Sequence, residues 1–135
     1  MSERREARPA GSHDPARSNH RGQASVELAL AFPLVVVMLL AIVQVALVVR
    51  DQVAVIHAAR EGARAAAVTG AGPADGVAAA QAATRLEPGR LAVQVVKGTE
   101  VRAATRYRSP TNVPIVGRLI GDVTVEATAV MRAEP

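Results

Sequence analysis

The chain of 135 residues carries a formal net charge of +4, and half of its residues are apolar. This length allows one small domain in addition to any membrane segment. The absence of cysteine excludes disulfides, thiolate metal sites and thiol catalysis. One tyrosine and one phenylalanine offer almost no stacking surface for bases, so the excess of arginine does not predict a nucleic-acid partner.

The first 20 residues are polar and rich in proline, serine and arginine, without apolar periodicity. Such a segment cannot bury enough apolar surface to fold by itself. It predicts a disordered leader rather than a domain, extending to the start of the apolar run that follows.

An uncharged run extends from Leu28 to Val49, with Gln44 as its only strongly polar side chain. About 20 apolar residues suffice for a helix to cross a bilayer, so the run predicts a transmembrane helix in contact with membrane lipid. A cleaved secretory signal is the alternative, but Arg50 and Asp51 stand where small residues would mark the cleavage site. Arginines flank both ends equally, so charge does not determine the orientation.

A glycine and a glutamate stand at the entry to this helix, with Glu27 as the fifth residue after Gly22. This spacing, between a basic leader and an apolar helix, resembles the processing signal of type IV prepilins and pseudopilins. The resemblance implies that a membrane prepilin peptidase cleaves between Gly22 and Gln23 on the cytoplasmic side. The amino terminus would then be cytoplasmic and the carboxyl-terminal part extracytoplasmic. Glycine suits such a site because its backbone extends easily into a protease cleft.

Glu27 has two physical interpretations. An ionised carboxylate at the membrane edge is costly unless it is paired, and cleavage would create an amino group on Gln23 that pairs with it in the same or a neighbouring subunit. A glutamate near a helix start also interacts favourably with the helix dipole, with Ser25 available as a cap. The second interpretation explains Glu27 but not Gly22.

Two longer segments carry a family resemblance. Residues 22–40, GQASVELALAFPLVVVMLL, and residues 55–68, VIHAAREGARAAAV, resemble the TadE-like family of tight-adherence (Flp) pilus proteins, and residues 113–132 resemble its terminal strand. The resemblance implies a minor pseudopilin, a non-enzymatic subunit or assembly factor of a Flp-type pilus or type II secretion-like system. Its partners would be other pilin or pseudopilin subunits and the pilus assembly machinery, with no small-molecule substrate.

Nothing between Pro33 and Gly62 breaks a helix, so one helix is expected over residues 27–69, extending beyond the bilayer. In its outer half small residues recur at every fourth position, as Ala58, Gly62 and Ala66. Such a row allows another helix to approach closely. Alternatively it covers the protein's own sheet, and both can hold on adjacent faces.

Arg60, Glu61 and Arg64 add a charged stripe to this outer half. A solvated face is its default interpretation, and ion pairing between subunits is the alternative. Pro33 removes one helix hydrogen bond and should loosen the helix near Ala29. This kink either eases transfer from bilayer to fibre or has no consequence.

The remaining sequence predicts an α+β domain in which residues 70–76 form a linker and residues 77–86 a short helix. Three segments are therefore expected along the chain: a disordered leader cleaved after Gly22 (1–22), a transmembrane and extended helix (23–69) and a small extracytoplasmic domain (70–135).

From Leu91 onward the apolar period changes to two. A tight hairpin is expected at Lys97 and Gly98, and a last strand from Asp122 to Arg132. The fold class is thus α+β, with a long helix, a short helix and a three-stranded antiparallel sheet polar on one side. The inward-facing side chains expected on the second strand are Val101, Ala103, Thr105 and Tyr107.

The connection over residues 109–121 is long for so small a domain and carries five large apolar residues. It either tucks under the sheet as part of the core or stays partly exposed as a partner surface or a membrane-dipping tip.

No catalytic site, metal or cofactor is expected, because His57 is the only histidine after the leader and no nucleophile or phosphate-binding motif is present. Two other functions stay open. One is an uncleaved single-pass anchor that presents a binding domain unrelated to a pilus. The other is a released protein whose basic sheet face, Arg102, Arg106 and Arg108, contacts anionic polymers.

Overall fold

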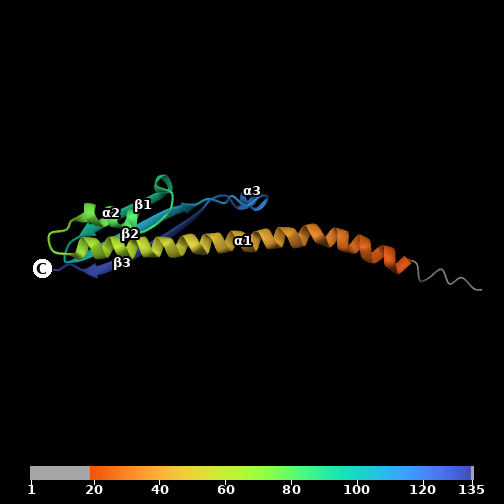
Figure 1. Ribbon diagram of the computed structural model, residues 1–135, viewed down its shortest axis with the longest axis horizontal. Coiled ribbons are helices and arrows are strands. Elements are labelled where there is room, and N and C mark those ends of the chain that lie inside the picture. The colour runs from red at the N-terminus through yellow and green to blue at the C-terminus, as the bar shows by residue number, and fades with distance from the viewer. Residues whose placement is uncertain (1–18, 135) are drawn as a thin grey trace, which may run out of the picture. The chain divides into compact units, whose positions relative to one another are not determined.

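The structure, a computed structural model, describes residues 19–134, so most of the expected leader lies outside the described residues. The described chain is α+β, with a long apolar helix, short helices and a three-stranded antiparallel sheet, which confirms the predicted fold class (Figure 1). The elements in chain order are α1 (Asn19–Ala67), α2 (Pro73–Ala82), η2 (Pro88–Arg90), β1 (Leu91–Lys97), β2 (Glu100–Ser109), α3 (Val116–Ile120) and β3 (Val123–Arg132).

The chain divides into two compact units, Met1–Val36 and Val37–Pro135. The described part of the first unit is the beginning of α1, whose large apolar side chains are exposed. Within the described residues one helix, Gly22–Ala67, is long and apolar enough to cross a membrane. The rest of α1 belongs to the second unit, together with the sheet and the short helices.

The sheet has the order β1-β2-β3, and both neighbouring pairs are antiparallel. Strand β1 pairs with β2 from Leu91 opposite Tyr107 to Lys97 opposite Val101. All four side chains predicted to face inward on β2 are buried, which confirms the period-two pattern. Strand β2 runs antiparallel to the outer half of α1, because Val101 clusters with Ala67 and Tyr107 clusters with Val55.

Two clusters of buried side chains form the core of the second unit. The alanine cluster lies towards the end of α1 and consists of Ala63, Ala66, Ala67, Val101 and Ala103. The tyrosine cluster lies towards the start of β1 and consists of Val55, Leu91, Tyr107 and Val125.

Polar contacts fix α1 to the sheet beside these clusters. Ser109 Oγ donates to Asp51 Oδ2 at 2.6 Å, and Gln52 Nε2 donates to the backbone oxygen of Glu126 at 3.0 Å. Beyond the end of α1, Lys97 Nζ donates to the carbonyl of Ala71 at 2.8 Å. These bonds begin immediately after the uncharged part of α1 ends.

The short helix begins earlier than expected, at Pro73 rather than at residue 77. Proline suits the first turn because its missing N–H would have no helical partner. The Gly72 N–H donates to Asp75 Oδ2 at 2.7 Å, which satisfies another donor at this helix start. The expected linker therefore contributes the first turn of α2.

Two other boundaries also differ from expectation. Helix α1 begins at Asn19 rather than at residue 27. The expected loop over residues 109–121 contains α3, which was not predicted. Within this connection Val113 and Val116 are buried as part of the core. The other large apolar side chains, Ile115, Leu119 and Ile120, are exposed, as expected of a partner surface or membrane-dipping tip.

Candidate functional site

The expected cleavage residues and Glu27 lie on one open face of α1. This face is lined by Gly22, Gln23, Val26, Glu27 and Leu30, all in the first unit. Their side chains are exposed, and a Cβ added to Gly22 would meet nothing within 4 Å. Gln23 and Glu27 are four residues apart, which places them one above the other on the helix.

The bond between Gly22 and Gln23 is helical in the structure, within the first turns of α1. A protease binds its substrate in extended form, so cleavage would require local unwinding. The first four N–H groups of a helix have no intrahelical acceptor, and glycine is a poor helix former, so the unwinding costs little here. Pro33 lies inside α1 in the same unit and is exposed.

Two members of the row of small residues, Gly62 and Ala66, meet α2 of the same chain. A Cβ built on Gly62 would lie 3.0 Å from Ala80 Cβ and 3.0 Å from the Gly76 carbonyl oxygen. Ala58 and Ala66 are both fully buried. In the second unit, the close helix approach that this row permits is therefore used by α2.

Gly76 and Ala80 form the other half of this contact and were missed in the sequence. A Cβ on Gly76 would lie 2.7 Å from the Gly62 carbonyl oxygen and 2.9 Å from Ala66 Cβ. Their spacing of four residues repeats the spacing on α1. Small residues four positions apart on both helices were therefore the feature of the sequence that could have predicted this contact.

The charged stripe lies on the solvent side of α1. Arg64 donates to Glu61 Oε2 from Nε at 3.0 Å and from Nη2 at 2.9 Å. Arg60 is exposed as well. An exposed pair of this kind contributes little to stability, so its side chains remain available for a partner.

The family model described as TadE-like protein matches residues 22–64. This stretch of the chain is TadE-like. No curated protein and no solved structure matches the chain. The match confirms the resemblance over the matched residues, and the TadE-like family points to an association with a Tad pilus.

The TadE-like segment contains nearly all the residues singled out in the sequence. It begins at Gly22, includes Glu27 and Pro33, and ends at Arg64. Only Ala66, of the residues expected to pack against another helix, lies beyond it. The sheet, α2 and α3 also lie outside the match, so the family gives no information on their role.

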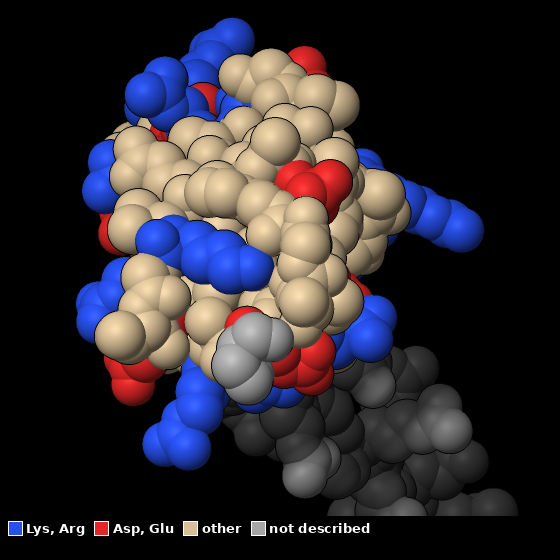
Figure 2. Space-filling model, turned by 90° about the vertical axis from the view of Figure 1, so that its left-hand side faces the viewer, with Lys and Arg blue, Asp and Glu red and all other residues tan. Residues whose placement is uncertain are grey.

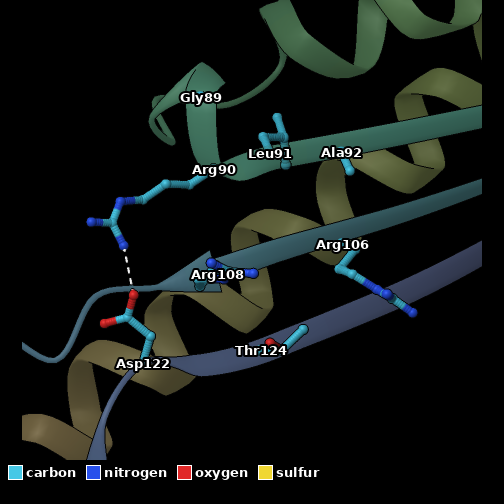
Figure 3. A pocket seen from close by; sticks show the side chains of 8 residues that line it. All are labelled: Gly89, Arg90, Leu91, Ala92, Arg106, Arg108, Asp122 and Thr124. Carbon is cyan, nitrogen blue, oxygen red and sulfur yellow. Dashed lines mark hydrogen bonds and ion pairs between the residues drawn. The ribbon is translucent and has the colours of Figure 1, made fainter.

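Beyond the TadE-like segment, the outer face of the sheet carries arginines around a pocket (Figure 3). Arg90 from η2 reaches Asp122 with Nη1 and Oδ2 2.9 Å apart, and Arg106 pairs with Glu126 at 2.8 Å. The hydrogen bond to Asp122 raises the pKa of Arg90. Two cations of this face are thus neutralised, which weakens the case for an anionic polymer as its partner.

Charge is also mixed at the end of the second unit that holds the carboxyl terminus. Figure 2 shows blue and red side chains interspersed around its rim, with a centre that is mostly uncharged. Within residues 19–134, no group of three or more His, Cys, Asp or Glu side chains could hold a metal ion.

Proposed function

We propose that the chain is a TadE-like minor pseudopilin, a non-enzymatic subunit or assembly factor of a Flp-type pilus or related type II secretion-like system. The observation that carries the proposal is the start of the family match. It begins at Gly22, the residue after which the sequence pattern predicts cleavage, and it continues along α1 to Arg64. Apart from Gly22 itself, the matched stretch therefore lies in the part of α1 that would remain after processing.

In this proposal the protein is a single-pass protein of the cell membrane, with its leader in the cytoplasm and its sheet domain outside. The length and apolar character of α1 support a membrane span. The polar bonds from Asp51 and Gln52 to the sheet support a domain that begins where the uncharged run ends.

Processing in this proposal is hydrolysis of one peptide bond by a prepilin peptidase. Water adds across the bond after Gly22, leaving a carboxylate on Gly22 and a new amino group on Gln23. That amine would lie one helical turn from Glu27, within reach of its carboxylate or of the same group in a neighbouring subunit. Pairing removes much of the cost of holding either charge at the membrane edge.

Assembly in this proposal uses the faces of α1 that the second unit leaves uncovered. Gly62 and Ala66 meet α2 and Ala58 is fully buried, so these residues are not proposed as the contact with other pilin subunits. Arg60 and Arg64 are exposed and lie on the same helix. These cations, together with the exposed apolar residues of the transmembrane part, are the proposed contacts.

Cleavage is tested by intact mass and N-terminal sequencing of the protein extracted from membranes of cells with an active prepilin peptidase. We expect a chain that begins at Gln23, and a Gly22→Leu variant that retains its leader. Gly89→Leu is the matched control, because a Cβ at Gly89 also meets nothing within 4 Å. A native chain that keeps its leader would contradict the proposal and favour the membrane-anchored binding protein.

The role of Glu27 is tested separately by Glu27→Ala. We expect this variant to be inserted and cleaved normally but to support few or no pili, because the new amino group loses its partner. Glu100→Ala, at another exposed carboxylate, is the control. Pili are counted by electron microscopy, and normal piliation in the Glu27→Ala strain would rule out this mechanism.

A further inference from the structure

The connection between β2 and β3 ends in an apolar tip, defined here as residues 113–121. Its inner side chains Val113 and Val116 are 8% and 4% exposed. Its outer side chains Ile115, Leu119 and Ile120 are 53%, 78% and 62% exposed. Three large apolar side chains on one short exposed segment indicate a contact with something other than water.

The connection that carries the tip begins beside Asp51, just after the uncharged part of α1 ends. Strand β2 descends along α1 from the alanine cluster to the tyrosine cluster, and its last residue, Ser109, bonds to Asp51. The connection continues past the ends of the strands, and in Figure 1 α3 lies beyond them in the direction of the start of α1.

Burial on α1 continues into the uncharged run. Gln44 is only 4% exposed, although it stands in the uncharged run. It lies one turn before Val48, which packs against the tyrosine cluster. Neither polar atom of its side chain has a hydrogen-bond partner among the described residues. On the other sides of this stretch large apolar side chains such as Ile42 and Val45 are exposed.

The backbone of the tip satisfies many of its own polar groups. Pro114 and the preceding Pro110 have no N–H to satisfy. The Val116 N–H donates to the Pro114 carbonyl at 2.8 Å, and the Gly121 N–H donates to the Gly117 carbonyl at 3.1 Å. Non-helical backbone enters a bilayer only if its polar groups are paired or buried in protein, so these bonds suit an apolar medium.

The backbone of Ile115, one of the outer residues of the tip, is strained. Ile115 has φ 71° and ψ −55°, close to the values of a strained γ-turn, and its neighbours Pro114 and Val116 make the corresponding hydrogen bond. Positive φ is a strained conformation for a β-branched residue. This strained conformation leaves the Ile115 side chain more than half exposed. Exposure to water would not offset the strain, whereas contact with an apolar medium would.

Cations stand at the base of the tip. Arg108 and Asp122 lie on either side of the connection, and Arg90 pairs with Asp122 at the same end of the sheet (Figure 3). Arg108 and Arg118, the latter on α3 itself, are exposed. Arginine beside an apolar insertion can reach lipid phosphates while its side-chain stem stays in the apolar layer.

We propose that the tip inserts into the outer leaflet of the same bilayer that α1 crosses, with Arg108 and Arg118 at the level of the lipid phosphates. The proposal rests on the transmembrane topology put forward above. The occupant is lipid, because the tip continues the apolar surface of the uncharged part of α1. The tip then screens Gln44 from the acyl chains, and the domain is held against the membrane at two points.

The test uses the full chain, which has no native cysteine. The variants Leu119→Cys, Val96→Cys and Ile42→Cys are each labelled with the fluorophore NBD in detergent. They are then reconstituted into phosphatidylcholine–phosphatidylglycerol vesicles with or without doxyl-labelled lipid. Val96 is the matched control, since it is 67% exposed and lies near the hairpin at the opposite end of the sheet. Ile42 reports on the helix itself.

We expect blue-shifted emission and doxyl quenching for the Leu119 and Ile42 probes and neither effect for the Val96 probe. If Leu119 behaves like Val96 while Ile42 is quenched, tip insertion is wrong and the transmembrane topology stands. If Ile42 is also unquenched, the topology fails and the insertion proposal fails with it.

Discussion

The two halves of the domain core stabilise the fold in opposite ways. The alanine cluster contains one residue larger than alanine, Val101, whereas the tyrosine cluster contains none as small as alanine. The difference follows the position of α2, which approaches α1 at the alanine cluster through Gly62 and Gly76. Where two helix backbones meet directly, the core depends on the absence of side chains. At the other end it depends on their volume.

The comparison predicts that each half fails under a different kind of substitution. In the tyrosine cluster truncation should be costly, because the removed atoms leave a cavity. In the alanine cluster enlargement should be costly, because no space is available and backbone atoms cannot move aside.

The largest effect is expected from Tyr107→Ala. Tyr107 is only 4% exposed and is the largest residue of its cluster. Truncating a buried aromatic residue should lower the free energy of unfolding by about 3 kcal/mol. Chemical denaturation followed by circular dichroism in detergent micelles measures this loss. Tyr107→Phe is the control, since it keeps the ring and should lose much less at neutral pH.

A smaller but more diagnostic effect is expected from Gly76→Ala. A new Cβ would lie 2.7 Å from the Gly62 carbonyl oxygen, 2.9 Å from Ala66 Cβ and 3.1 Å from Val95 Cγ1. Overpacking of this kind should cost about 2 kcal/mol. Replacing glycine by alanine in an uncrowded helix would instead be stabilising, so the sign of the change is informative.

Gly89→Ala is the control for Gly76→Ala, because its Cβ would meet nothing within 4 Å. We expect it to change the free energy of unfolding by less than about 0.5 kcal/mol. If Gly76→Ala proved as stable as this control, α1 and α2 would not be in direct backbone contact, and the comparison between the clusters would fail.

Much of the domain was predictable because its strands follow a simple rule. Alternation identified Val101, Ala103, Thr105 and Tyr107 as the buried face of β2, and all four are buried. Alternation is a local property, since each side chain direction depends only on its position in the strand. The long apolar helix α1 was predictable for a similar reason, because length and the absence of charge are visible in the sequence, although its first residue was not.

Features that depend on two distant segments were not predictable in the same way. Gly62 and Gly76 are each an ordinary small residue until the fold brings their backbones together. The start of α2 did have a local signal in Pro73 and Asp75, which stand at the first turn of the helix. The α3 helix is too short to show an apolar period, and it depends on Gly117, where an added Cβ would collide with the Thr111 carbonyl oxygen.

The smallest effect expected in the tyrosine cluster depends on pH. Desolvation in the folded state is the main reason that the pKa of Tyr107 is raised above its ordinary value of 10.0, with the Asp51 carboxylate adding to the rise. The phenol therefore ionises first in the unfolded chain. Its contribution to stability is complete below pH 10.0 and is lost as the pH rises from there through the folded-state pKa.

Unfolding curves measured at increasing pH should show this loss in the native protein but not in Tyr107→Phe, where the titrating group is absent. Other groups titrate equally in both proteins, so the difference between the two curves isolates the tyrosine. Because the chain has a single tyrosine, its absorbance on ionisation reports the folded-state pKa directly. Ionisation at the ordinary value in the folded protein would mean that water reaches this end of the core, which would then be less tightly packed than the end closed by α2.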